Sequence, residues 1–427
     1  MTAAPRRTLW LGWVIWSLGA AFYLFAYFQR VSPSVMTDSL MREFGVTAAS
    51  LGNLSAFYFY PYALLQIPLG LMIDRIGPGR LMIGAALLSA VGAAVFSTTT
   101  SLEMAAFGRF LIGAGSSVSW VGALTLALLW LPPQRFAMVS GLTLLVGLCG
   151  AALGQAPLAA VIAVVGWRTA ILWSAGFIGL VALAMMVLLR KTPETAPKTI
   201  VRTGVLQGLK MVARVRNTWM VSLYTVFMVT PMAAFGGLWG VPYAMEAYGL
   251  SRPAAGATMS LMLIGWGIGG PIAGWISDSL KRRKSVMLSG PIILLGIWSV
   301  ILGVPDLPLT ALRVLLFCGG LFSGVSIINF AITRESNRPE VTGLAMGIIN
   351  TAGMGASALM LPFIGFLLDQ GWDGAMRDAV RVYDVATYRG AFLTFGIGMA
   401  ISVVAGLLFR ETHAKPLEVS GAAAPSR

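Results

Sequence analysis

About twelve long apolar stretches run through this chain of 427 residues, and no other feature constrains its fold as strongly. They cover residues 9–36, 51–73, 81–100, 103–131, 136–165, 168–189, 218–247, 254–277, 285–304, 309–333, 341–368 and 389–409. Each reaches or exceeds the ~20 residues that a helix needs to cross the hydrocarbon core of a bilayer. Because a backbone in lipid must satisfy its hydrogen bonds internally, we expect helices here. The sequence therefore predicts an all-α membrane protein with twelve transmembrane helices.

Composition agrees with this prediction. Hydrophobic residues make up 57% of the chain and charged residues only 11%, whereas soluble proteins carry about 25% charged residues. The first stretch follows Arg6 and Arg7 and in this respect resembles a secretory signal. It is too long for a signal core, and eleven more stretches follow it. We therefore expect a permanent span.

The net charge of +14 first suggests a nucleic-acid partner, but the distribution of the charges gives a different interpretation. With both termini inside, the segments on the outer side hold only Arg42, Arg168, Arg252, Arg377, Arg381 and Arg389, and most of the 30 basic residues lie inside. This asymmetry is the positive-inside rule. It predicts a protein of the cell inner membrane with cytoplasmic termini, surrounded by lipid and without nucleic acid.

Residues suited to catalysis or metal binding are scarce. Cys149 and Cys318 both fall inside predicted spans, and the sole histidine, His413, lies in the polar C-terminal tail. The spans contain no Asp, Glu or His near their middle, and the chain has no HExxH or GxSxG motif. We therefore predict no disulfide framework, no metal, no cofactor and no enzymatic activity. A receptor or scaffold that does not transport remains an alternative.

The chain is organised as a repeat. A basic segment, 191–217, is predicted to be a cytoplasmic linker between six helices in 1–190 and six helices plus a tail in 218–427. Matching residues recur in the same order at an offset of 204 or 205, which is typical of duplicated transporter halves. The matches are Gly70 and Asp74 with Gly274 and Asp278, Arg109 with Arg313, and Pro157, Gly166 and Trp167 with Pro362, Gly371 and Trp372.

Two of these repeats lie in loops that suggest a gate. One loop runs from Gly70 to Arg80 and the other from Gly274 to Lys284, each with a carboxylate beside basic residues. Such a carboxylate can pair with bases and with a helix N-terminus, and so hold one side shut. The predicted gating residues are Asp74, Arg75, Arg80, Asp278 and Arg282. The paired loops resemble the signature loop of the major facilitator superfamily, and this resemblance implies a transporter that works by alternating access, which we expect to be a monomer.

Within that superfamily, the segment from Tyr27 to Arg80 is similar to the organic anion symporter families. Gln29-Arg30 stands where those proteins commonly carry Asp-Arg, and Gln66-Ile-Pro-Leu-Gly70 follows in the expected order. The sequence departs from the pattern at Gln29 and at Ser116, where those families carry acidic residues. In those families the acidic residues at these two positions take part in proton transport, so the resemblance does not imply proton coupling for this chain.

Arg30, Arg109 and Arg313 are the ionisable residues that we place inside spans, and such residues are usually functional. Helical spacing puts Arg30 on one face with two tyrosines. Similar polar and aromatic faces occur on the second, fourth and seventh spans. We predict that these faces line a central substrate site, made of Arg30, Tyr23, Tyr27, Tyr58, Tyr62, Ser116, Trp120, Trp239 and Tyr243. Alternatives are a helix-capping role for Arg30, a structural role for Arg109 and an interfacial anchor at Arg313.

A fixed guanidinium favours a carboxylate or phosphate, which it can hold through two hydrogen bonds. With aromatic walls, this predicts a small organic anion, an amino acid or a short peptide as substrate. All 16 acidic residues fall at or beyond the span ends, and Glu246 is the single plausible residual proton site. We therefore predict uniport or exchange. The alternatives are a proton-coupled symporter and an antiporter of the drug-efflux type.

Overall fold

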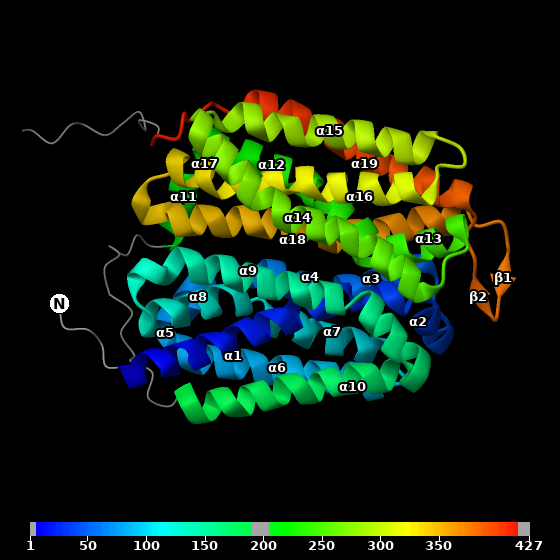
Figure 1. Ribbon diagram of the computed structural model, residues 1–427, viewed down its shortest axis with the longest axis horizontal. Helices are drawn as coiled ribbons and strands as arrows, with labels where there is room; N and C mark the ends of the chain where they lie inside the picture. The colour runs from blue at the N-terminus through cyan, green and yellow to red at the C-terminus, as the bar shows by residue number, and fades with distance from the viewer. Residues whose placement is uncertain (1–5, 190–204, 417–427) are drawn as a thin grey trace, which may run out of the picture.

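The computed structural model describes residues 6–189 and 205–416, and these form two groups of helices that lie side by side (Figure 1). We call α1–α10 the N-terminal half and α11–α19 the C-terminal half. The predicted linker 191–217 lies outside the described residues up to residue 204, so its extent stays a prediction.

The N-terminal half contains, in chain order, α1 (Arg6–Val31), η1 (Ser32–Val35), α2 (Thr37–Phe44), α3 (Ala48–Ala56), α4 (Phe59–Leu65), α5 (Leu69–Ile76), α6 (Pro78–Thr98), α7 (Leu102–Ser116), α8 (Ser119–Trp130), η2 (Pro133–Arg135), α9 (Phe136–Leu153) and α10 (Ala156–Leu188).

The C-terminal half contains α11 (Val205–Ala213), α12 (Arg216–Pro231), η4 (Met232–Trp239), α13 (Gly240–Tyr248), α14 (Arg252–Leu280), α15 (Arg283–Gly303), α16 (Leu309–Ser323), η5 (Gly324–Ile327), α17 (Ile328–Ser336), η6 (Pro339–Val341), α18 (Thr342–Gln370), the strands β1 (Met376–Arg377) and β2 (Val380–Arg381), and α19 (Val385–Leu408).

The spans agree with the twelve apolar stretches. Among the described residues, ten helical segments are long and apolar enough to cross a membrane. One further segment is a pair of helices, Ala48–Leu65 and Leu69–Ile76, bent by 68°, and a shorter apolar helix covers Met138–Leu153. These segments are consistent with the predicted all-α fold of twelve transmembrane helices in two halves.

Glycine and proline set the breaks between and within spans. Gly166 has φ 79°, a conformation that L side chains rarely adopt, and it interrupts α10 at the predicted boundary between the stretches 136–165 and 168–189. Pro68 precedes α5 where the second span bends. In the seventh span, Pro231 is followed by the π-helical segment η4, as expected where proline removes a backbone donor.

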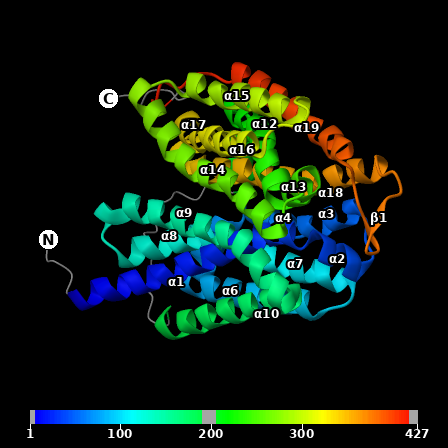
Figure 2. The same ribbon diagram turned by 45° about the vertical axis from the view of Figure 1, so that its right-hand side comes forward.

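The two halves meet where α18 and α14 of the C-terminal half pack against helices of the N-terminal half. α18 runs against α3 and α4, and α14 runs against α9 and α10 (Figures 1 and 2). A Cβ on Gly52 would lie only 2.4 Å from the carbonyl oxygen of Leu361, so α3 and α18 approach closer than a side chain would allow. We call the end with α2, β1 and β2 the hairpin end, and the end with α5, α11 and α17 the linker end (Figure 1).

Candidate functional site

Arg30 lies in the last turn of α1 and faces three aromatic rings. Its guanidinium carbon is 4.4 Å from the ring centre of Tyr27, 5.2 Å from that of Tyr62 and 5.8 Å from that of Tyr58. Tyr27 precedes it by three residues on α1, whereas Tyr58 and Tyr62 come from the second span. Rings at these distances attract a cation through their negative faces. Arg30 makes no ion pair in the part of the chain that the structure describes.

Arg109, on α7, is completely buried. Its Nη1 donates a hydrogen bond of 2.7 Å to the backbone carbonyl of Gln29, which joins α7 to α1. Its guanidinium carbon is 5.2 Å from the ring centre of Tyr58. Its Nε and Nη2 have no hydrogen-bond partner within the described ranges. Arg109 therefore holds two helices together and keeps unused donors.

Both arginines lie beside the ring of Tyr58. Their guanidinium carbons can therefore be no farther apart than the sum of their two distances to its centre, about 11 Å. Neither has a carboxylate partner among residues 6–189 and 205–416. In the N-terminal half, Gln29 Oε1 and the hydroxyl oxygens of Ser55 and Ser116 are also buried without a hydrogen-bond partner among the described residues. Arg109 is buried and Arg30 partly buried, and two such cations without a counter-ion among the described residues form a region that attracts anions.

Aromatic and apolar side chains from both halves pack around the tyrosines of α1. The ring of Tyr23 lies 5.0 Å from the rings of Tyr27 and Trp120, measured between centres. Tyr23 and Tyr27 pack in one apolar cluster with Leu263 from α14 and Met232 from η4. The region therefore has a cationic side in the N-terminal half and an apolar side to which the C-terminal half contributes.

The three residues predicted on the seventh span contact residues of the C-terminal half, and their part in the substrate site stays a prediction. Trp239 Nε1 donates to the carbonyl of Leu361 at 3.2 Å. Tyr243 packs against Phe235 and Phe392 within the C-terminal half. Glu246 pairs with Arg377 at the hairpin end. Trp239 ends the π-helical η4, and Tyr243 and Glu246 follow on the regular helix α13.

The predicted gating loops lie at the linker end. Asp74, Arg75 and Arg80 are exposed around the short connection between α5 and α6. In the second loop, Asp278 pairs with Arg283. Arg282, which the sequence suggested as a gating base, is exposed beside it.

Arg283 is the centre of a buried network that sequence analysis missed. Its side chain is 8% exposed and pairs at 2.7 Å with Glu335 on α17, which is 7% exposed. Thr412 Oγ1 donates to the same carboxylate. The sequence placed Glu335 on the inner side, but a contact between residues 52 positions apart has no local signal. The loop between α14 and α15 is therefore held in place by residues of its own half.

No group of three or more His, Cys, Asp or Glu side chains that could hold a metal ion occurs in the described residues.

Known proteins resemble the chain over most of its length. The family model of the Major Facilitator Superfamily matches residues 18–359 and 232–426. A probable sulfoacetate transporter of Cupriavidus necator is 23% identical over 371 residues, covering 82% of this chain and 85% of that protein. A probable galactarate/D-glucarate transporter of Bacillus subtilis is 23% identical over 390 residues, covering 80% and 82% respectively.

A solved structure has the same fold. It is a bacterial homolog of the human lysosomal transporter Spinster in an inward-facing, unoccupied conformation, with a TM-score of 0.73 and 15% identity. The match covers 93% of this chain and 96% of that one.

Proposed function

The chain belongs to the major facilitator superfamily and is a multi-pass membrane transporter, and from this premise we propose that it carries a small organic anion by alternating access. The observation that carries the proposal is the pair Arg30 and Arg109, which face the same tyrosine without a carboxylate partner in the described part of the chain. A carboxylate or sulfonate would supply the missing counter-charge and accept the unused N–H groups.

The rest of the substrate meets a different surface. Tyr23, Leu263 and Met232 offer aromatic, aliphatic and thioether contacts and no charge. An anion with one acidic group and an apolar or weakly polar remainder fits both sides. An amino acid or peptide fits less well, because its ammonium group would lie near two arginines. The names of the two relatives, one for sulfoacetate and one for sugar diacids, support an anion without deciding between these classes.

The cross-half bonds indicate which way the site opens. Two cross-half ion pairs, Arg252 with Asp38 and Arg42 with Asp378, lie at the hairpin end, as do the bonds from Asp369 to the backbone of Ala48 and Ala49. Nearer the linker end, the halves are joined by neutral hydrogen bonds, from Asn350 to Gln66 and from Thr351 to the carbonyl of Ala63. We propose that this end is closed and that substrate enters from the linker end. If the linker end is cytoplasmic, as the positive-inside rule predicts, this is an inward-facing state of an inner-membrane protein with both termini inside.

The proposal is tested by binding to purified protein. Melting temperatures are measured with a set of carboxylates, sulfonates and organic cations, and affinities are then determined for whichever compounds stabilise the protein. We expect anions to stabilise it. Arg30→Ala should abolish this effect, and Arg30→Lys should weaken binding about 10- to 100-fold, since a point charge cannot reproduce a two-pronged contact worth about 1.5–3 kcal/mol.

The matched control is Arg313→Ala on α16, the repeat counterpart of Arg109, whose Nε donates to Thr258 away from the tyrosines. We expect its affinity to stay within about threefold of wild type, a change below 1 kcal/mol. Wild-type affinity in folded Arg30→Ala protein would overturn the assignment. Stabilisation by organic cations alone would favour the alternative of a drug-efflux antiporter.

A further inference from the structure

The connection between α18 and α19, residues 371–384, forms a small β-hairpin that projects at the hairpin end (Figure 1). β1 and β2 pair antiparallel, with Arg377 opposite Val380. The turn residues Asp378 and Ala379 have φ of 50° and 63°, the left-handed pair that a tight two-residue hairpin turn requires. We call residues 371–384 the strap.

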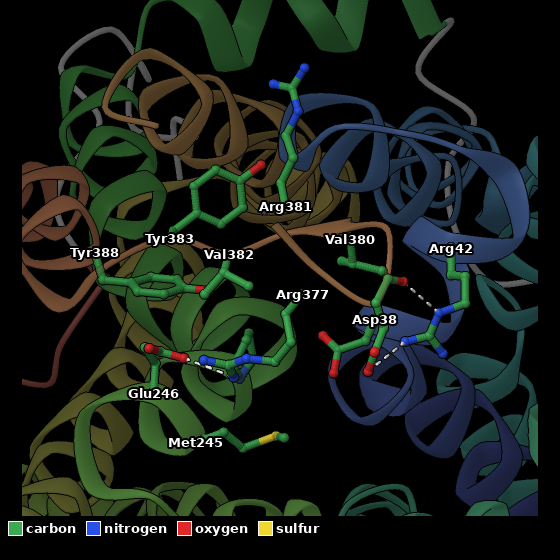
Figure 3. A pocket seen from close by; sticks show the side chains of 12 residues that line it. Asp38, Arg42, Met245, Glu246, Arg377, Val380, Arg381, Val382, Tyr383 and Tyr388 are labelled. Carbon is green, nitrogen blue, oxygen red and sulfur yellow. Dashed lines mark hydrogen bonds and ion pairs between the residues drawn. The ribbon is translucent and has the colours of Figure 1, made fainter. Parts of the chain in front are cut away.

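The strap contacts both halves (Figure 3). On the N-terminal half, Arg42 of α2 donates through Nε to the carbonyl of Asp378 at 3.2 Å and lies 3.9 Å from its carboxylate. On the C-terminal half, Arg377 pairs with Glu246 of α13 at 3.3 Å. A cavity of about 110 Å³ lies between these contacts. The strap therefore crosses the interface between the two halves, which would have to open if the halves separated at this end.

Asp369, in the last turn of α18, anchors the strap. Its carboxylate accepts a hydrogen bond of 2.6 Å from the hydroxyl of Tyr383 and lies 3.4 Å from Arg381. The same carboxylate accepts from the backbone N–H groups of Ala48 at 3.2 Å and Ala49 at 2.9 Å. Those groups begin α3, in the opposite half, where a carboxylate also meets the positive end of the helix.

The environment of Tyr383 keeps this arrangement in place. Burial, followed by the bond to Asp369, raises the pKa of the Tyr383 hydroxyl, so it remains a protonated donor. A single carboxylate thus ties the strap, α18 and the start of α3 together.

The contacts differ in strength. Arg42 and Asp378 are 52% and 81% exposed, and ion pairs as open as this contribute little. The Asp369 side chain is only 15% exposed and serves several donors at once. Breaking its contacts would leave buried polar groups without partners. We therefore take Asp369 as the main contact that holds the strap to α3. Arg42 contributes little energy, but it shows that the tip of the strap lies against α2.

We propose that the strap, anchored by Asp369, is the latch of the hairpin end: it holds the halves together in this state and must leave α2 and α3 for the opposite state. The inference rests on the alternating access of the proposed function. It does not depend on which substrate is carried, so its test uses no substrate.

The first experiment measures opening. In protein with Cys149 and Cys318 replaced by Ser, Ser34→Cys places a reporter on η1, where the side chain is fully buried. A membrane-impermeant maleimide is applied from the hairpin side. We expect Asp369→Asn to raise the labelling rate at least several-fold. The matched control is Asp373→Asn, whose carboxylate bonds to Ala375 within the strap and should leave the rate unchanged.

The second experiment locks the strap. In the Asp369→Asn reporter protein, Arg42→Cys with Asp378→Cys is joined by a short bis-methanethiosulfonate, which forms a reducible disulfide with each cysteine. Labelling at position 34 should fall to background and return on reduction. Joining Glu246→Cys with Arg377→Cys, an ion pair within one half, should leave labelling high. Unchanged labelling in folded Asp369→Asn protein, or labelling that continues with positions 42 and 378 joined, would overturn the latch.

Discussion

At the residue scale, glycines decide how closely the helices around the two arginines approach. A Cβ on Gly113, one turn beyond Arg109, would lie 1.9 Å from the carbonyl oxygen of Tyr58. A Cβ on Gly147 would lie 2.5 Å from the ring of Tyr23. Both neighbours belong to the predicted site, so the small residues place the tyrosines as well as allow the helices to pack.

Gly113→Ala is therefore expected to damage site and fold together. The added methyl meets backbone, which cannot rotate away, and overpacking of this kind costs about 1–3 kcal/mol. The melting temperature should fall and anion binding should weaken, because Tyr58 is displaced from between Arg30 and Arg109. Gly176→Ala on α10 is the control: its Cβ would meet nothing within 4 Å. Equal stability and binding in the two variants would contradict the argument.

Sequence spacing could predict only those site residues that lie near one another on the same helix. Arg30 with Tyr27, and Tyr58 with Tyr62, follow from positions three or four apart on helices, and the structure brings these four residues together. The sharing of Tyr58 by Arg30 and Arg109 joins three spans, and no spacing encodes it. The pairing of Arg283 with Glu335 was missed for the same reason.

At the element scale, apolar length predicted the spans, and irregular backbone limited what could be said of their faces. The stretches 136–165 and 168–189 were separated correctly because Gly166 breaks the helix there. The π-helical η4 has no comparable signal in the sequence, and the contacts of Trp239 and Tyr243 that follow it are with Leu361 and Phe235 of the C-terminal half. Spacing arguments hold only while the helix is regular.

The loop between α14 and α15 allows a prediction that separates neighbouring arginines. Arg283→Ala would leave Glu335 buried without its partner, and removing one member of a buried pair costs about 3–5 kcal/mol. Arg282→Ala removes an exposed side chain and should change stability by no more than about 0.5 kcal/mol. Melting temperatures of both variants in the same detergent check this. If both variants lost a similar amount of stability, the buried ion pair with Glu335 would not explain the effect of Arg283→Ala.

At the scale of the whole molecule, the repeat at an offset of 204 predicted two related halves but not how they meet. The contacts of α18 with α3 and of α14 with α10 lie between halves, where the repeat gives no register. The acidic residues show the same limit. Glu246, the one proton site suggested by sequence, pairs with Arg377 at the hairpin end and belongs to the surroundings of the strap.

This placement bears on energy coupling. Proton symport requires a group whose protonation changes as the site opens to each side, and in the described chain neither Arg30 nor Arg109 has a carboxylate partner that could serve. Asp369 and Glu335, two acids of the described chain with little exposed surface, are held at opposite ends by Tyr383 and Arg283. We therefore expect uniport or exchange, in which the anion moves down its own gradient or against a second anion.

In proteoliposomes, an imposed pH gradient should fail to concentrate an anion that stabilises the purified protein, whereas the same anion preloaded inside should accelerate uptake of labelled anion. Glu246→Gln should change neither result, because its partner Arg377 lies in the same half. Proton-driven accumulation that disappears in Glu246→Gln would make that residue the coupling group despite its position. Accumulation that survives Glu246→Gln would contradict the absence of a proton site near the arginines, and Asp369→Asn would then show whether the latch itself carries the proton.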